Sequence, residues 1–138
     1  YNRLAHTYED AIVFKRKEAF EKKALTEMVD RSTINEKAIV IMDRGYESYN
    51  VMAHIQEKGW FYLIRVKDFG KHKTGIIDGL ELPNAEEFNE CIDLNLTRKQ
   101  TNEMKTLFKM KKKYRRIAHN KTFDYLPSTS KKSDATVM

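Results

Sequence analysis

The chain has 138 residues, a length typical of a single domain. Hydrophobic residues make up 41% of the sequence and charged residues 33%, which allows a core of modest size. No apolar run approaches the roughly 20 residues of a membrane span, so we expect no membrane partner. The one cysteine, Cys91, has no partner for an internal disulfide, which indicates a reducing cytoplasm.

The positive charge of the chain is concentrated in one segment. Residues 98–121 contain ten Lys or Arg residues and one acid, Glu103, which gives this segment +9 against +6 for the whole chain. Such a segment can attract the phosphate backbone of a nucleic acid. A solvated charged loop that binds nothing is the alternative, and charge alone does not separate the two.

The N-terminal third predicts a short strand followed by an amphipathic helix. Residues 8–14 end in an apolar stretch and predict the strand. The helix is predicted over 16–31, because apolar residues recur there at the spacing of one helical face. That face carries Phe20, Ala24, Leu25, Met28 and Val29.

Residues 38–66 predict a strand, a helix and a second strand. The apolar, β-branched run 38–42 is typical of a strand buried on both faces. Gly45 then supplies a turn, and Ser48 is the predicted N-cap of a helix that runs to about Lys58. Gly59 is placed as the residue that ends this helix, and 60–66 is the next strand. Short connections between these elements predict a parallel βαβ unit.

Three residues of the helix in this βαβ unit, Val51, Met52 and Ile55, are predicted to point inward, whereas His54 is expected at its surface. The C-terminal half gives weaker signals. Extended structure is expected at 76–82, a helical turn at 84–89, a helix within 97–110 and a strand at 123–126. The polar tail 128–134 follows.

Asp43 stands at the C-terminal end of the predicted strand 38–42, just before the turn. Ligands of open α/β sheets bind outside the carboxyl ends of strands, and a carboxylate there can hold Mg²⁺. Two alternatives remain equally open from position alone. Asp43 could cap the following helix, or it could pair with Arg44 or Arg65.

Other residue types give no metal or nucleophile signature. No short metal-ligand spacing links the histidines, and Cys91 has no Cys or His neighbour in the sequence, which argues against a zinc site. The sequence has no phosphate-binding Gly-rich loop and no nucleophile elbow.

The block 39–67 resembles bacterial insertion-sequence transposases of the DDE type. The resemblance is carried by Asp43-Arg44-Gly45-Tyr46 after a strand and by Ile64-Arg65 at the end of the next one. Weaker similarity extends upstream over 24–31 and downstream over 96–100. It implies an α/β fold: a partial ribonuclease H-like core (strand–helix–strand–helix–strand) over 1–68, then part of an irregular, basic, β-rich insertion over 69–138.

The resemblance also implies metal-dependent DNA strand cleavage and strand transfer. Asp43 would be the second catalytic Asp and a ligand of Mg²⁺ or Mn²⁺, and the DNA partner would be the transposon ends. A structural ion pair is the alternative role for Arg65. The residues expected to contact DNA are Arg44, Arg65, Lys67, Lys111, Lys112, Lys113, Arg115 and Arg116.

The sequence departs from the full family pattern. The first catalytic Asp belongs on an earlier strand, and the final Glu on a later helix with a Tyr-x-x-Arg-x-x-x-Glu pattern, which does not occur here. We therefore expect part of a longer enzyme, with weak metal binding and no activity alone. The alternatives are a non-catalytic DNA-binding remnant that uses 98–121, and an unrelated α/β domain. Exposed strand edges would allow self-association, and the expected location is the bacterial cytoplasm, on the nucleoid.

Overall fold

The computed structural model divides into two compact units, residues 1–65 and 66–138, and each is described by itself. Both mix helices with small sheets, so the expected α/β class is confirmed at that level. The residues that the structure describes are 1–15, 20–66, 75–77, 80, 82–109, 114–126 and 134–137.

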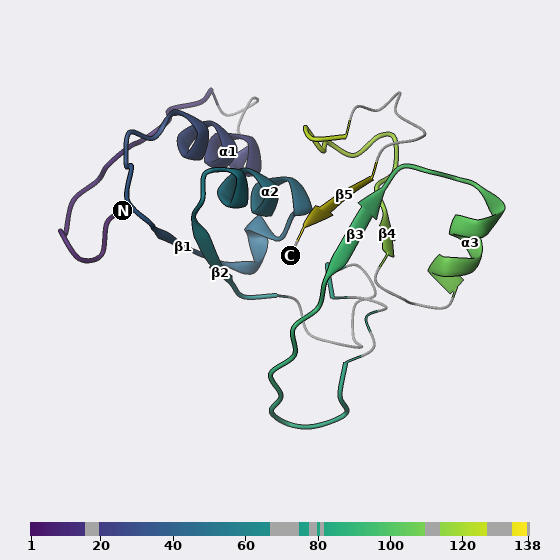
Figure 1. Ribbon diagram of the computed structural model, residues 1–138. Helices are drawn as coiled ribbons and strands as arrows, with labels where there is room; N and C mark the ends of the chain where they lie inside the picture. The colour runs from purple at the N-terminus through teal and green to yellow at the C-terminus, as the bar shows by residue number, and fades with distance from the viewer. Residues whose placement is uncertain are drawn as a thin grey trace. The chain divides into compact units, whose positions relative to one another are not determined.

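The first unit contains the predicted βαβ arrangement (Figure 1). Strands β1 (Ile39–Met42) and β2 (Phe61–Ile64) pair in parallel, with Ile39 opposite Phe61 and Met42 opposite Ile64. The chain between them forms a 3-10 turn, η2 (Arg44–Tyr46), and helix α2 (Tyr49–Glu57). Helix α1 (Glu21–Arg31) precedes β1.

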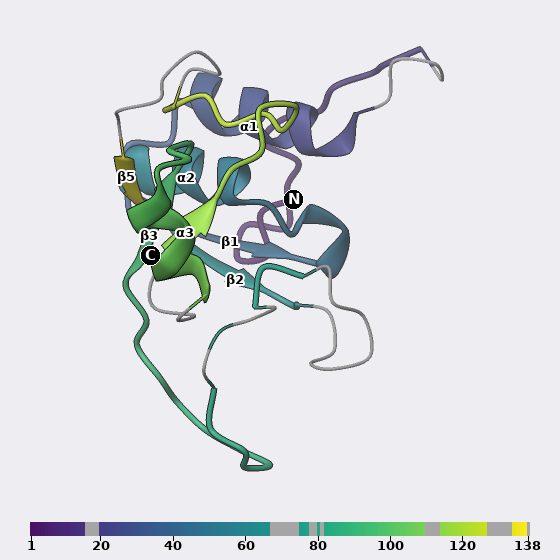
Figure 2. The same ribbon diagram turned by 90° about the vertical axis from the view of Figure 1, so that its right-hand side faces the viewer.

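Both helices of this unit cover the same face of the β1–β2 sheet, as Figures 1 and 2 show. The core between the helices and the sheet contains side chains from α1, α2, β1 and β2. Ile55 of α2 is fully buried, and all three residues predicted to point inward from this helix are buried. The central cluster consists of Val29, Met42, Val51, Ile55 and Trp60.

The opposite face of the β1–β2 sheet is exposed. The expectation that the strand over 38–42 is buried on both faces is therefore wrong. Its side chains are apolar yet 57–65% exposed, because α1 and α2 both pack on the other face. These side chains are Ile39, Ile41, Phe61 and Leu63. Within the described residues, β1 and β2 have only each other as strand partners, and self-association through strand edges stays a prediction.

Helix α2 begins and ends as the sequence predicts. Ser48 is its N-cap residue, in an extended conformation. At the other end Gly59 has a φ of 75°, a left-handed conformation in which glycine avoids the Cβ clash. The amide of Gly59 donates to the Gln56 carbonyl and that of Trp60 to the Ile55 carbonyl, which is the Schellman pattern of helix ends.

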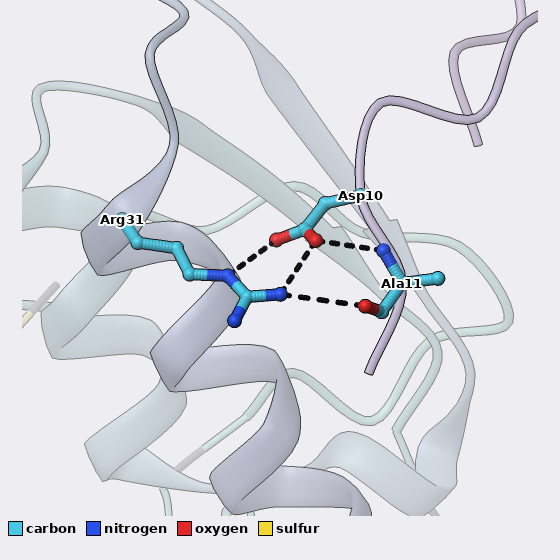
Figure 3. Close-up of polar contacts among 3 residues, drawn as sticks. All are labelled: Asp10, Ala11 and Arg31. Carbon is cyan, nitrogen blue, oxygen red and sulfur yellow. Dashed lines mark hydrogen bonds and ion pairs between the residues drawn. The ribbon is translucent and has the colours of Figure 1, made fainter. Parts of the chain in front are cut away.

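The N-terminal segment differs from its prediction. Residues 8–14 form no strand, and the described part of 1–15 has only an isolated bridge between Asn2 and Thr7. The segment is held instead by side chains, since Asp10 accepts two hydrogen bonds from Arg31 at the end of α1 (Figure 3). Helix α1 starts at Glu21, later than predicted, and Phe20 is exposed; residues 16–19 lie outside the described part.

The second unit has a three-stranded sheet in the order β4-β3-β5 (Figure 1). Strand β3 (Leu94–Thr97) pairs in parallel with β4 (Tyr114–Arg116) and antiparallel with β5 (Asp134–Val137). Helix α3 (Asn102–Lys109) connects β3 to the chain that leads into β4. The buried apolar side chains of this unit are Leu94, Leu96, Met104, Ile117, Phe123 and Leu126.

Several weak predictions in this unit are wrong. Residues 84–87 form bends and 88–89 have no regular structure, so the helical turn is absent, and 123–126 form a turn in which Leu126 donates to the Phe123 carbonyl. The helix predicted within 97–110 is confirmed as α3, and residues 98–101 before it form a loop, which the sequence left open as the alternative for 97–100. Parts of the predicted extended piece 76–82 and of the tail lie outside the described residues. Over the described chain, no helix is both long and apolar enough to cross a membrane.

Candidate functional site

Asp43 is the first residue after β1, and its backbone remains extended. One carboxylate oxygen accepts the amide N–H of Arg44 at 2.8 Å. The Asp43 carbonyl accepts the amide of Tyr46 at 3.0 Å, which closes the turn η2. Asp43 therefore caps this 3-10 turn, whereas the helix that follows, α2, has Ser48 as its N-cap residue.

Arg65 provides the second structural role. Its backbone amide donates to the Met42 carbonyl at 3.1 Å, which extends the β1–β2 ladder by one step. The parallel register thus brings residues 43 and 65 to the same edge of the sheet. The Nε atom of Arg65 lies 3.4 Å from Oδ1 of Asp43, and the two side chains are 68% and 65% exposed. An ion pair this exposed contributes about 0–1 kcal/mol to stability.

The carboxylate of Asp43 has the right chemistry for a hard divalent cation, but it stands alone. Mg²⁺ prefers oxygen ligands, and a two-metal site needs several carboxylates around the ions. In the part of the chain that the structure describes, no group of three or more His, Cys, Asp or Glu side chains is close enough to hold a metal. The donor type therefore fits, but the described residues supply too few donors to hold a metal ion.

The residues predicted to contact DNA fall in both units. Arg44 and Arg65 are exposed beside Asp43. In the second unit, Arg116 of β4 is exposed, whereas Arg115 is half-buried and its Nη1 donates to the Tyr114 carbonyl at 3.0 Å. Lys67, Lys111, Lys112 and Lys113 lie outside the described residues.

Arg98 has a role that the sequence did not predict. It was counted in the basic segment 98–121, yet its side chain is 2% exposed. The guanidinium donates to three backbone carbonyls, those of Leu126 (2.8 Å), Ala118 (2.7 Å) and Lys121 (3.0 Å). The available signal was its place in the alternation with Leu94 and Leu96, since every second side chain of a strand lies on the same face.

His54 is also placed differently from its prediction. It is buried in α2, not at the surface, and its Nδ1 lies 2.7 Å from Oδ1 of Asp30 at the end of α1. Lys58 reaches the same end of α1 and donates to the carbonyls of Asp30 (3.3 Å) and Ser32 (2.8 Å). These contacts join the two helices, which makes them structural.

Comparison of the chain with known proteins gives one informative result. The family model described as Transposase DDE domain matches residues 10–137. Comparison with curated proteins finds no match, and comparison with solved structures finds none either. The matched region includes Asp43, Arg44 and Arg65, the residues that meet at the carboxyl edge of β1 and β2. Because the match covers nearly the whole chain, the protein belongs to the transposase DDE domain family.

Proposed function

We propose that this chain is part of a transposase that cleaves DNA and transfers the cut strand with the help of divalent metal ions. The single observation that carries the proposal is the exposed Asp43 carboxylate at the carboxyl end of β1, in a chain of the DDE family. The proposed setting is a ribonuclease H-like core with a β-rich insertion, acting on transposon ends in the bacterial nucleoid.

In this proposal Asp43 supplies one ligand of the catalytic metal ions. When bound, such ions activate the attacking oxygen and stabilise the leaving oxygen of a phosphodiester. Asp43 is suited to its part because strand β1 and turn η2 fix its backbone on both sides. The described residues hold no group of three or more metal-ligating side chains. The Tyr-x-x-Arg-x-x-x-Glu pattern of the final Glu does not occur in the sequence, so we expect this chain alone to bind metal weakly and to be inactive.

Arg44 and Arg65 are the proposed DNA contacts beside Asp43, because both guanidinium groups are exposed at that edge. Lys67, Lys111, Lys112, Lys113, Arg115 and Arg116 are proposed as further phosphate contacts. Phosphate contacts position a protein on DNA without reading its sequence. We therefore expect DNA affinity that falls steeply with salt and has little sequence preference.

The metal role is tested by adding Mn²⁺ to the isotope-labelled chain and recording which amide NMR signals broaden. We expect broadening around residues 42–46 only at high Mn²⁺ concentration. Asp43→Asn should abolish it there, and the amide-bearing side chain still offers an oxygen to the Arg44 N–H. Asp93→Asn, at an exposed acid of the second unit, is the matched control. Broadening near residue 43 that survives Asp43→Asn would contradict the proposal.

A non-catalytic DNA-binding protein is the second candidate function. The observation that favours it is a set of exposed cations in the second unit that does not involve Asp43. They are Lys105, Lys109, Arg116 and Lys121. In that case Asp43→Asn would leave both DNA affinity and its dependence on Mn²⁺ unchanged.

A further inference from the structure

The carboxyl edge of the parallel pair β3–β4 carries a second candidate site, separate from Asp43. Arg98 directly follows β3, and residues 117–126 directly follow β4. The amide of Ile117 donates to the Thr97 carbonyl at 2.8 Å, which continues the ladder past the ends of both strands. Segments that leave a parallel pair at its carboxyl edge are a common position for binding sites.

Arg98 shapes the chain that follows β4. Its three carbonyl acceptors belong to Ala118, Lys121 and Leu126, so one guanidinium holds both ends and the middle of residues 118–126. Two turns complete the loop, since Lys121 donates to the Ala118 carbonyl and Leu126 to the Phe123 carbonyl. Residues 118–126 are called the Arg98 loop.

The Arg98 loop is anchored on its inner side and polar on its outer side. Phe123 and Leu126 are 3% and 1% exposed and fasten the loop to the core of the unit. His119, Asn120 and Lys121 are exposed, and an open hollow lies against them. That hollow is lined by Arg98 and residues 119–124.

The electrostatics of this hollow favour an anion. The contacts of Arg98 are to neutral carbonyls, so its positive charge is buried without a carboxylate partner among them. A charge in a low-dielectric surrounding acts over a longer range than one in water. Lys121 adds a second positive charge at the rim. Asp124 also lines the hollow and opposes this effect, which leaves a net positive lining.

We infer that the Arg98 loop is a phosphate-binding site for the DNA backbone, with Lys121 and His119 as contacts and Arg98 as the positioning residue. The inference rests on the proposed function only where it names DNA as the ligand. The preference for an anion follows from the charges of the loop itself. Within the basic segment 98–121, it assigns Arg98 to shaping the site and not to touching DNA.

The test follows amide NMR signals of the labelled chain during titration with inorganic phosphate and, separately, with duplex DNA. Both should shift signals of residues 118–126. In DNA binding, Lys121→Ala should lower the slope of log affinity against log salt by about 1, the loss of one phosphate contact. Lys37→Ala, at an exposed lysine of the first unit, is the charge-matched control and should leave both the salt slope and the response of residues 118–126 as before.

Arg98 is tested by Arg98→Lys, which keeps the charge but carries all its donors on one nitrogen, whereas Nε, Nη1 and Nη2 of Arg98 each reach a different carbonyl. We expect the variant to lose the phosphate-induced shifts, although its net charge is unchanged. If Arg98→Lys fails to fold, Lys121→Ala and His119→Ala still decide the question, because both residues are exposed.

The outcomes separate this inference from the proposed function. DNA binding that leaves the signals of 118–126 unmoved, with a salt slope for Lys121→Ala equal to that for Lys37→Ala, would overturn the site and leave the role of Asp43 intact. Phosphate shifts at 118–126 without any DNA binding would overturn the assignment to DNA.

Discussion

Arg31 and Asp10 form a two-point ion pair between segments that are 21 residues apart in the chain. Nε of Arg31 donates to Oδ2 of Asp10 at 2.8 Å and Nη2 donates to Oδ1 at 2.5 Å, while Oδ1 also accepts the Ala11 amide (Figure 3). The hydrogen bonds from Arg31 hold the pKa of Asp10 below its ordinary value of 3.8. The pair fixes the N-terminal segment against the end of α1.

The first prediction concerns pH. Because the pKa of Asp10 is lower in the folded chain, the stability that this carboxylate contributes is present above about pH 3.8 and is lost as the pH falls through the lowered value. The difference in Tm between the wild type and Asp10→Asn should therefore be largest at neutral pH and should shrink below pH 3.8. A difference that stays constant down to pH 2 would contradict this.

The second prediction compares two isoleucines of the same unit. Ile55 is 0% exposed at the centre of the core, and Ile39 is 65% exposed on the open face of the sheet. Ile55→Ala should lower the free energy of unfolding by about 2–5 kcal/mol, and Ile39→Ala by about 0.5 kcal/mol or less. Urea unfolding followed by Trp60 fluorescence reports on this unit alone, since Trp60 is the single tryptophan. Equal effects would refute the one-sided core.

The third prediction concerns two glycines. Gly59 has a φ of 75°, and a Cβ there would meet no atom within 4 Å. Gly59→Ala should therefore cost about 1–2 kcal/mol through backbone conformation alone. Gly45 has the same open surroundings without the left-handed φ, so Gly45→Ala is the matched control. The same urea experiment measures both, and a Gly59→Ala effect no larger than the control would count against the Schellman end of α2.

The region 39–64 was predicted well because its signals are local. The β-branched run of β1, Ser48 before α2 and Gly59 after it each act through the conformation of a few neighbouring residues. The inward side chains of α2 follow from helical periodicity. The prediction that strand 38–42 is buried on both faces was wrong, because the exposure of Ile39 depends on which face of the sheet the helices cover. No local sequence pattern determines that face.

The second unit was predicted poorly because its contacts join distant segments. Strand β4 is Tyr-Arg-Arg, with no apolar alternation to mark it, and it exists through pairing with β3. The charge of Arg98 suggested the surface, whereas its partners are carbonyls 20–28 residues away. The edge position of Asp43, by contrast, was predictable, since it follows from the end of one strong strand.

The fourth prediction concerns Arg98 as a structural residue. Arg98→Met would keep much of the buried volume but leave the carbonyls of Lys121 and Leu126 without their donor, while the Ala118 carbonyl keeps the Lys121 amide. Leaving a buried polar group unsatisfied costs about 1–3 kcal/mol each, so the loop should open well before the rest of the unit. Hydrogen exchange by mass spectrometry should show faster exchange over 118–126, with Lys121→Ala as the control. Unchanged protection of this segment would contradict the role of Arg98.

The last prediction tests the pairing of Arg65 with Asp43, and it rests on the proposed metal role. The pair is exposed, so Arg65→Ala should change the unfolding free energy by less than about 1 kcal/mol. Its electrostatic effect should be larger, because a guanidinium 3.4 Å from the carboxylate repels an arriving Mn²⁺ and competes for the same oxygen. Arg65→Ala should therefore broaden the amide signals near residue 43 at several-fold lower Mn²⁺ concentration. Lys23→Ala, which removes an exposed cation paired with Glu27 on α1, should leave that concentration unchanged. If Arg65→Ala behaves like Lys23→Ala, the guanidinium does not control access of cations to Asp43.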